Sequence, residues 1–270
     1  DTHWSPGSSG IGFAVKEGGG SSAIPLGHWP LDDGSGTVAR DTVGSFPGSL
    51  VGAGDGSAFW DADSPQVPGG PESSLLFNGT DNYVQTTFPG IGGAGSRTVV
   101  FWVKSTDTSD HGIVSWGSSS SNSHRYHIRL NSNPASGTEG AIRCEVGGAN
   151  TVGSTALSDN QWHHVAVVFA QDTTPDISDV RFYIDGILDP KSGTGNLPVD
   201  TDISGPDATP VVIGRRVIGS DRYFSGRLAD IAIYDVALDP DDIAQLASGS
   251  SRPSSPIGIG NYISTSVEGA

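Results

Sequence analysis

Residues 161–169 (QWHHVAVVF) decide the fold of this chain. The stretch has no glycine or proline, and its second half is β-branched and aromatic, which is typical of a strand. Its apolar residues hardly alternate with polar ones, which indicates that both faces of the strand are covered. Residues 180–184 (VRFYI) and 187–188 (IL) follow, separated by Asp185-Gly186. Because Asp-Gly tolerates the positive φ angles of a type I′ turn, we predict a hairpin at the centre of an antiparallel sheet.

Other short apolar runs surround this centre, each bounded by Gly, Ser, Asn or Asp. They lie at residues 26–31, 38–41, 74–77, 82–85, 98–104, 112–117, 125–130, 141–146, 211–214 and 226–234, with a loop-rich region up to residue 70. One helix is expected after Asp239, which is a good N-cap, with Pro240 in its first position and Gly249 as its end. The pattern predicts an all-β protein, a two-sheet antiparallel jelly-roll sandwich with one short C-terminal helix and extended terminal arms.

The predicted core consists of large apolar side chains from these runs. They are Trp162, Val165, Val167, Phe182, Ile184, Phe101, Phe77 and Ile231.

The composition limits the partners of this chain. Its 270 residues carry a net charge of −16, and 25 of the 30 acidic residues are Asp. Such a surface repels nucleic acid and anionic membranes, and no apolar run approaches the roughly 18 residues of a membrane helix. The single Cys144 excludes an internal disulfide and is expected to be a buried thiol. No signal peptide is visible and Met is absent, so we expect a mature extracellular or cell-surface product, trimmed at its N-terminus.

The order of five motifs resembles the LamG-like jelly-roll domains of the concanavalin A-like superfamily. The motifs lie at residues 28–36 (HWPLDDGSG), 76–84 (LFNGTDNYV), 162–167 (WHHVAV), 183–186 (YIDG) and 226–234 (GRLADIAIY), the last followed by 237–238 (AL). The resemblance covers residues 26–249 and implies two antiparallel sheets packed face to face. Residues 1–25 then form an N-terminal extended arm, and residues 250–270 a C-terminal extended tail.

The resemblance also implies a calcium site that ties the first segment to the last strand. The candidate ligands lie in or beside the turns that define the motifs: Asp33, Asp41, Asn78, Asp81 and Asp230. Carboxylates and backbone carbonyls suit Ca²⁺. The alternative explanation of the same pattern is turn chemistry, in which Asp and Asn side chains hydrogen-bond to their own backbone. Asp230 is the best single candidate, because turn chemistry does not account for an Asp within a strand.

Catalysis is not expected. Related folds include glycoside hydrolases with closely spaced carboxylates, and glycosidases need two such groups about 5–10 Å apart. None of the five Glu of this chain lies in a Glu-x-Asp-x-x-Glu pattern, and although two Asp could still meet in the folded chain, nothing in the sequence proposes such a pair. His163 and His164 are neighbours on a strand and point to opposite faces, so they cannot bind one metal ion together.

Two functions therefore stay open. The first is a non-catalytic module that binds glycans or a cell-surface protein, with Trp116, Tyr126 and Tyr223 as candidate stacking residues beside loops. The second is a structural subunit of an extracellular filament or coat that assembles by strand addition. Apolar residues of the arms would carry that assembly: Ile11, Phe13 and Val15 in the first arm, Ile257 and Ile259 in the second.

Overall fold

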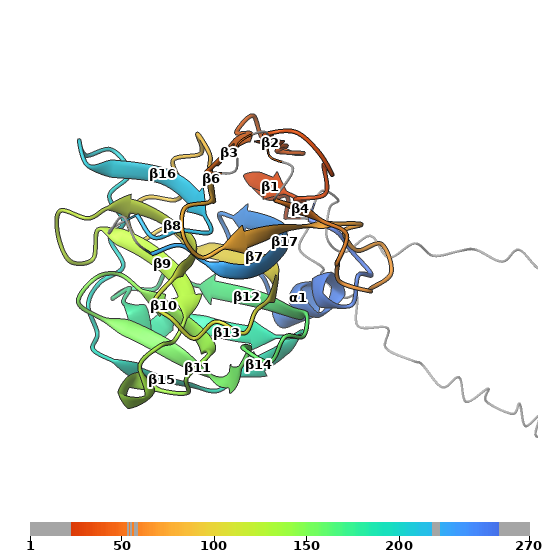
Figure 1. The fold of residues 1–270 in the computed structure, drawn as a ribbon. Coiled ribbons are helices and arrows are strands. Elements are labelled where there is room, and N and C mark those ends of the chain that lie inside the picture. The colour runs from red at the N-terminus through yellow and green to blue at the C-terminus, as the bar shows by residue number, and fades with distance from the viewer. Residues whose placement is uncertain (1–22, 53, 55, 57–58, 218–221, 254–270) are drawn as a thin grey trace, which may run out of the picture.

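The computed structural model describes residues 23–52, 54, 56, 59–217 and 222–253. They form two antiparallel β-sheets with one α-helix in the described ranges, α1 (Pro240–Ala247), and two single 3-10 turns, η1 (Pro134–Ser136) and η2 (Ile177–Asp179) (Figure 1). The predicted two-sheet sandwich with one short helix is therefore confirmed. The assembly residues predicted in the arms lie outside the described residues, so the filament stays a prediction.

The first sheet has eight strands and is built around the stretch that decides the fold. In sheet order they are β14 (Ile187–Asp189), β13 (Arg181–Ile184), β12 (His163–Phe169), β7 (Arg97–Lys104), β17 (Ser225–Tyr234), β5 (Ser74–Asn78) and β4 (Trp60–Asp61), with β1 (Gly27–Trp29) also paired to β17. The turn between β13 and β14 has φ angles of 52° at Asp185 and 82° at Gly186. The predicted hairpin and its positive φ angles are confirmed.

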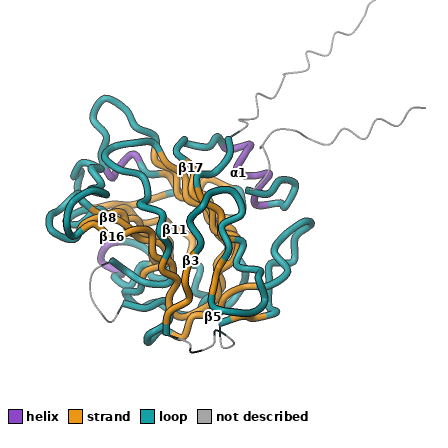
Figure 2. The backbone as a smooth tube through the Cα atoms, turned by 90° about the horizontal axis from the view of Figure 1, so that it is seen from above, coloured by secondary structure: helices purple, strands orange, loops and turns teal. Residues whose placement is uncertain are grey.

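The second sheet has nine strands and forms the other layer (Figure 2). In sheet order they are β15 (Lys191–Thr194), β11 (Asn150–Ala156), β10 (Ala141–Glu145), β9 (Arg125–Leu130), β8 (Gly112–Ser118), β16 (Ala208–Ile213), β6 (Tyr83–Gln85), β3 (Gly48–Val51) and β2 (Val38–Ala39).

The core lies between the sheets, and seven of the eight predicted core residues are buried in it. Trp162 is the exception: it lies one residue before β12, is only half-buried, and donates its indole N–H to Asp63 Oδ1 at 2.8 Å. The strand begins at His163, so Trp162 lies outside it, and the prediction for this residue is wrong. Cys144 is a buried free thiol, as predicted.

Helix α1 covers the outer face of the eight-stranded sheet. Asp239 caps it by accepting a hydrogen bond from the backbone N–H of Asp242 at 2.9 Å, as predicted. Its apolar residues Ile243 and Leu246 join a second apolar cluster with outward-facing residues of the sheet, among them Ala166 and Tyr234. No helix in the described ranges is long and apolar enough to cross a membrane.

The connection at Asn78-Gly79 differs from a hairpin. β5 belongs to the eight-stranded sheet and β6 to the nine-stranded one, so the turn carries the chain between layers. Gly79 has a φ of 75°, but Asn78 is not in the positive-φ region, so the type I′ geometry does not form. Instead, Asn82 Oδ1 accepts the backbone N–H of Asn78 at 2.8 Å and closes the turn.

Candidate functional site

The outer face of the nine-stranded sheet is charged where β8, β9 and β10 lie side by side. Alternation along β9 places Tyr126, Ile128 and Leu130 in the core. Arg125, His127 and Arg129 therefore face outward. On β10, Arg143 and Glu145 face the same way, because Ile142 and Cys144 belong to the core.

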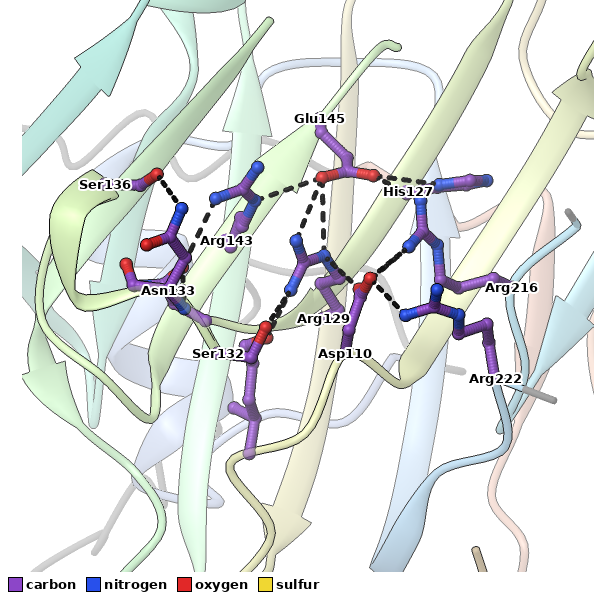
Figure 3. A network of polar contacts seen from close by, with 12 residues as sticks. Asp110, His127, Arg129, Ser132, Asn133, Ser136, Arg143, Glu145, Arg216 and Arg222 are labelled. Carbon is purple, nitrogen blue, oxygen red and sulfur yellow. Dashed lines mark hydrogen bonds and ion pairs between the residues drawn. The ribbon is translucent and has the colours of Figure 1, made fainter. Parts of the chain in front are cut away.

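Glu145 is the centre of this face (Figure 3). Its carboxylate accepts from Arg216 Nη2 at 2.7 Å, Arg143 Nε at 3.0 Å and Arg129 Nη2 at 3.3 Å. Burial alone would raise the pKa of Glu145, but the His127 hydrogen bond and the guanidinium charges hold that pKa well below its usual range. Glu145 therefore stays ionised, and it cannot donate a proton as a general acid.

Asp110 extends the network toward solvent. Arg216 Nη1 donates to both carboxylate oxygens of Asp110 at 2.8 Å, and Arg222 Nη1 donates to its Oδ2 at 2.6 Å. Arg129 Nε lies 3.1 Å from Asp110 Oδ1. Arg216 and Arg129 thus each bridge the two carboxylates. Sharing of this kind fixes the side chains in one arrangement, which is the preorganisation that a binding surface needs.

His127 has one nitrogen inside the network and one without a partner. Its Nδ1 lies 3.4 Å from Glu145 Oε1, and since an ionised carboxylate can only accept, Nδ1 carries the proton. Burial lowers the pKa of His127 to about 4, against the opposing effect of Glu145, so the ring is neutral at pH 7. Nε2 is then a buried hydrogen-bond acceptor that no described group satisfies.

Arg125 makes no ion pair with a described residue, although the charge of Glu145 acts on it from a longer distance. No hydrogen bond or ion pair joins its guanidinium to another described residue, and its Nε is buried without an acceptor. The guanidinium lies flat on the turn between β10 and β11: a Cβ at Gly147 would lie 2.6 Å from its Cζ. Gly147, at a φ of 82°, has no side chain, and this leaves the room that the guanidinium of Arg125 occupies.

The charge of this face contrasts with that of the whole chain. Five of the 11 arginines lie here, although the net charge of the protein is −16. Arg125, Arg129, Arg143, Arg216 and Arg222 bring five positive charges to a face that holds the two carboxylates of Glu145 and Asp110. The excess is positive, so the face attracts anionic groups at short range.

The predicted calcium ligands are occupied by the protein itself. Asp41 accepts four backbone N–H groups, Asp33 accepts from Arg40, and Asn78 and Asp81 bond to each other. In the described part of the chain, no group of three or more His, Cys, Asp or Glu side chains could hold a metal ion. Calcium binding stays a prediction from the resemblance, to be tested by melting with and without a chelator.

Asp230 has a structural reason for its place in a strand. It lies at a β-bulge of β17, with a φ of 53°. Its Oδ1 is 2.7 Å from His28 Nε2 and 3.4 Å from Arg252 Nη2. Burial would raise the pKa of Asp230, but His28 and then Arg252 keep that pKa below its usual value. A buried His–Asp pair thus joins the first strand to the last, where the resemblance implies a cation.

Two of the three predicted stacking residues are in the core. Trp116 and Tyr126 are fully buried, and the guanidinium of Arg97 lies 5.9 Å and 5.0 Å from their ring centroids. No ring face is left for a sugar, so this part of the prediction is wrong. Tyr223 is half-buried against Tyr83 and follows Arg222 of the charged network.

The charged network was not predicted, although part of its signal is readable in the sequence. Residues 125–129 (RYHIR) and 143–145 (RCE) alternate charged with apolar residues within predicted strands, which places the charges on one outer face. Asp110 and Arg216 gave no such signal, because they lie in loops and meet only in the folded chain.

Comparisons with known proteins agree with this architecture. Residues 78–244, more than half of the chain, match the family described as the concanavalin A-like lectin/glucanases superfamily. Among curated proteins, none matches the sequence.

Two solved structures are similar in fold. Domain 4 of AbnA, a GH43 extracellular arabinanase from Geobacillus stearothermophilus solved with arabinotriose, is 20% identical with a TM-score of 0.56, over 84% of this chain and 99% of that one. Trypanosoma rangeli sialidase is 17% identical with a TM-score of 0.51, over 83% of this chain but only 32% of its own. The chain belongs to the concanavalin A-like lectin/glucanase superfamily.

Proposed function

We propose that this chain is a non-catalytic carbohydrate-binding module that binds its glycan on the outer face of the nine-stranded sheet. The observation that carries the proposal is the preorganised polar network over β9 and β10, in a chain of lectin/glucanase fold. Glu145, Arg129 and Arg216 are buried in it, and Asp110, Arg125 and Arg222 are partly exposed at its edge. Sugars present many hydroxyl groups, and rigid charged side chains with free hydrogen-bonding capacity suit them.

The state of Glu145 supports binding rather than hydrolysis. A glycosidase needs one carboxyl group that can hold a proton, and such an acid has a raised pKa. The pKa of Glu145 is lowered instead, because guanidinium groups surround its carboxylate. The similarity to a sugar-bound domain of an extracellular enzyme also agrees with a module that works outside the cell, where polysaccharides lie.

A binding screen tests this proposal. Isothermal titration calorimetry with neutral oligosaccharides, such as arabinotriose and xylotriose, and with acidic ones should give binding by at least one class, and chromatography of the same mixtures should show no shortened products. If no oligosaccharide binds at millimolar concentration, the proposal fails. If the ligand is cut, the module is an enzyme.

A further inference from the structure

The geometry points to an acidic sugar, a uronate or a sulfated residue, as the ligand of this face, with Arg125 as the residue that binds its anionic group. This inference rests on the proposed function and names the chemical class of its ligand.

Arg125 differs from its neighbours in making no hydrogen bond or ion pair with a described carboxylate, and Glu145 acts on it only through its charge. Arg129, Arg143 and Arg216 each contact Glu145, and Arg129 and Arg216 contact Asp110 as well. The guanidinium of Arg125 is held by Gly147 on the same face, only half-buried, with no acceptor among the described residues. A planar guanidinium fixed in this way matches a carboxylate or a sulfate through paired N–H donors.

The local charge favours the same class of ligand. Five guanidinium groups face two carboxylates, so a bound anion would reduce the positive excess. A neutral sugar would leave that excess unchanged. Because the remainder of the protein is strongly acidic, a long acidic polymer would be repelled elsewhere, and short oligosaccharides are the better ligands.

His127 explains why the ligand should be a sugar and not a simple anion. Arg125 and His127 lie two residues apart on β9, on one face and about 7 Å apart along the strand. Arg125 Nε is an unpartnered donor, and His127 Nε2 is an unpartnered acceptor. An acidic sugar offers both an anionic acceptor and hydroxyl donors, but both protein atoms are closed to water here, so the sugar reaches them only once the side chains that cover them move apart. Sulfate alone, which has no hydrogen-bond donor, would leave the histidine unsatisfied.

A matched set of ligands and variants tests the inference. The ligands are oligogalacturonate, the same oligomer fully methyl-esterified, and a sulfated dextran oligosaccharide of similar length. The variants are Arg125→Gln, Arg125→Lys and the control Arg181→Gln, which removes one positive charge from an exposed residue of the other sheet. Thermal melting of each variant establishes that it is folded before titration.

We expect an anionic oligomer to bind at least about tenfold more tightly than the ester, since a hydrogen bond to a charged group is lost with the charge. Arg125→Gln should weaken that binding by about tenfold. The affinity of Arg125→Lys should lie between those of the parent protein and Arg125→Gln, because lysine keeps the positive charge but lacks the planar guanidinium. Arg181→Gln should bind as the parent protein does. Binding of the galacturonate would identify a carboxylate as the anionic group that the site selects, and binding of the sulfated dextran would identify a sulfate.

Two outcomes would overturn the inference. If the ester binds as tightly as the acid, or if Arg125→Gln weakens both equally, the module does not select for charge, although the proposed glycan binding stands. If neither the anionic oligomers nor any neutral oligosaccharide binds, the proposed function fails together with the inference.

Discussion

His163 and His164 are sequence neighbours with opposite environments, because successive side chains of β12 point to opposite sides. His163 Nδ1 lies 2.8 Å from Asp185 Oδ2, and that hydrogen bond raises its pKa. His164 is buried, with the ring of Trp102 5.2 Å away, and burial lowers its pKa to about 4. The alternation was predictable from the sequence. The two environments were not, because Asp185 and Trp102 come from other strands.

Acid should destabilise the fold through His164. Between pH 6.5 and 4, this imidazole is protonated in the unfolded chain but not in the native chain. The unfolded state therefore binds more protons, and the free energy of unfolding decreases as the pH decreases. We expect His164 to contribute about 2 kcal/mol of the fall between pH 7 and pH 5. Urea unfolding at both pH values should therefore show a smaller fall in His164→Gln than in the parent protein.

His163→Gln is the matched control for this prediction. The raised pKa of His163 stabilises the fold below pH 6.5 and loses that effect as the pH rises through the folded value. Its removal should therefore not reduce the fall toward acid. An equal pH response in the parent protein and in His164→Gln would show that burial does not suppress protonation at this position.

Two glycine turns show how far local sequence determines an element. Asp185-Gly186 and Asn78-Gly79 are both hairpin signals, yet only the first closes a hairpin. The difference comes from tertiary pairing: β6 pairs with β3 and β16 in the other sheet, and no local propensity encodes that choice. Strands β11 (NTVGSTA) and β15 (KSGT) were missed for a related reason, because Gly and Ser weaken the strand signal and the neighbouring strands supply the order.

The hairpin of β13 and β14 also packs on α1 through its turn. A Cβ at Gly186 would lie 3.2 Å from Ala244 Cα and 3.4 Å from Ala247 Cβ, and Gly186 has a φ of 82°. Gly186→Ala should therefore lower the free energy of unfolding by about 2 kcal/mol, from backbone strain together with the close contact. Gly34→Ala is the control: Gly34 has a φ of 71° with no atom within 4 Å of the added Cβ, so only strain of about 1 kcal/mol applies. Equal losses in urea unfolding would mean that the helix contact costs nothing.

For the whole molecule, the sequence determined the architecture more fully than the site. The order of five local motifs was enough to predict a two-sheet sandwich. The charged face required the fold, because Arg216 meets Glu145 across 71 residues and Asp110 across 106. Only the assembled nine-stranded sheet brings these groups together and leaves Arg125 beside them without an anion.

A crystal structure with the tightest-binding oligosaccharide of the screen tests the central claim most directly. We predict sugar density on the outer face of the nine-stranded sheet over β9 and β10, with an anionic group at the guanidinium of Arg125. Sugar bound to the eight-stranded sheet, or only to loops that join the two layers, would contradict it.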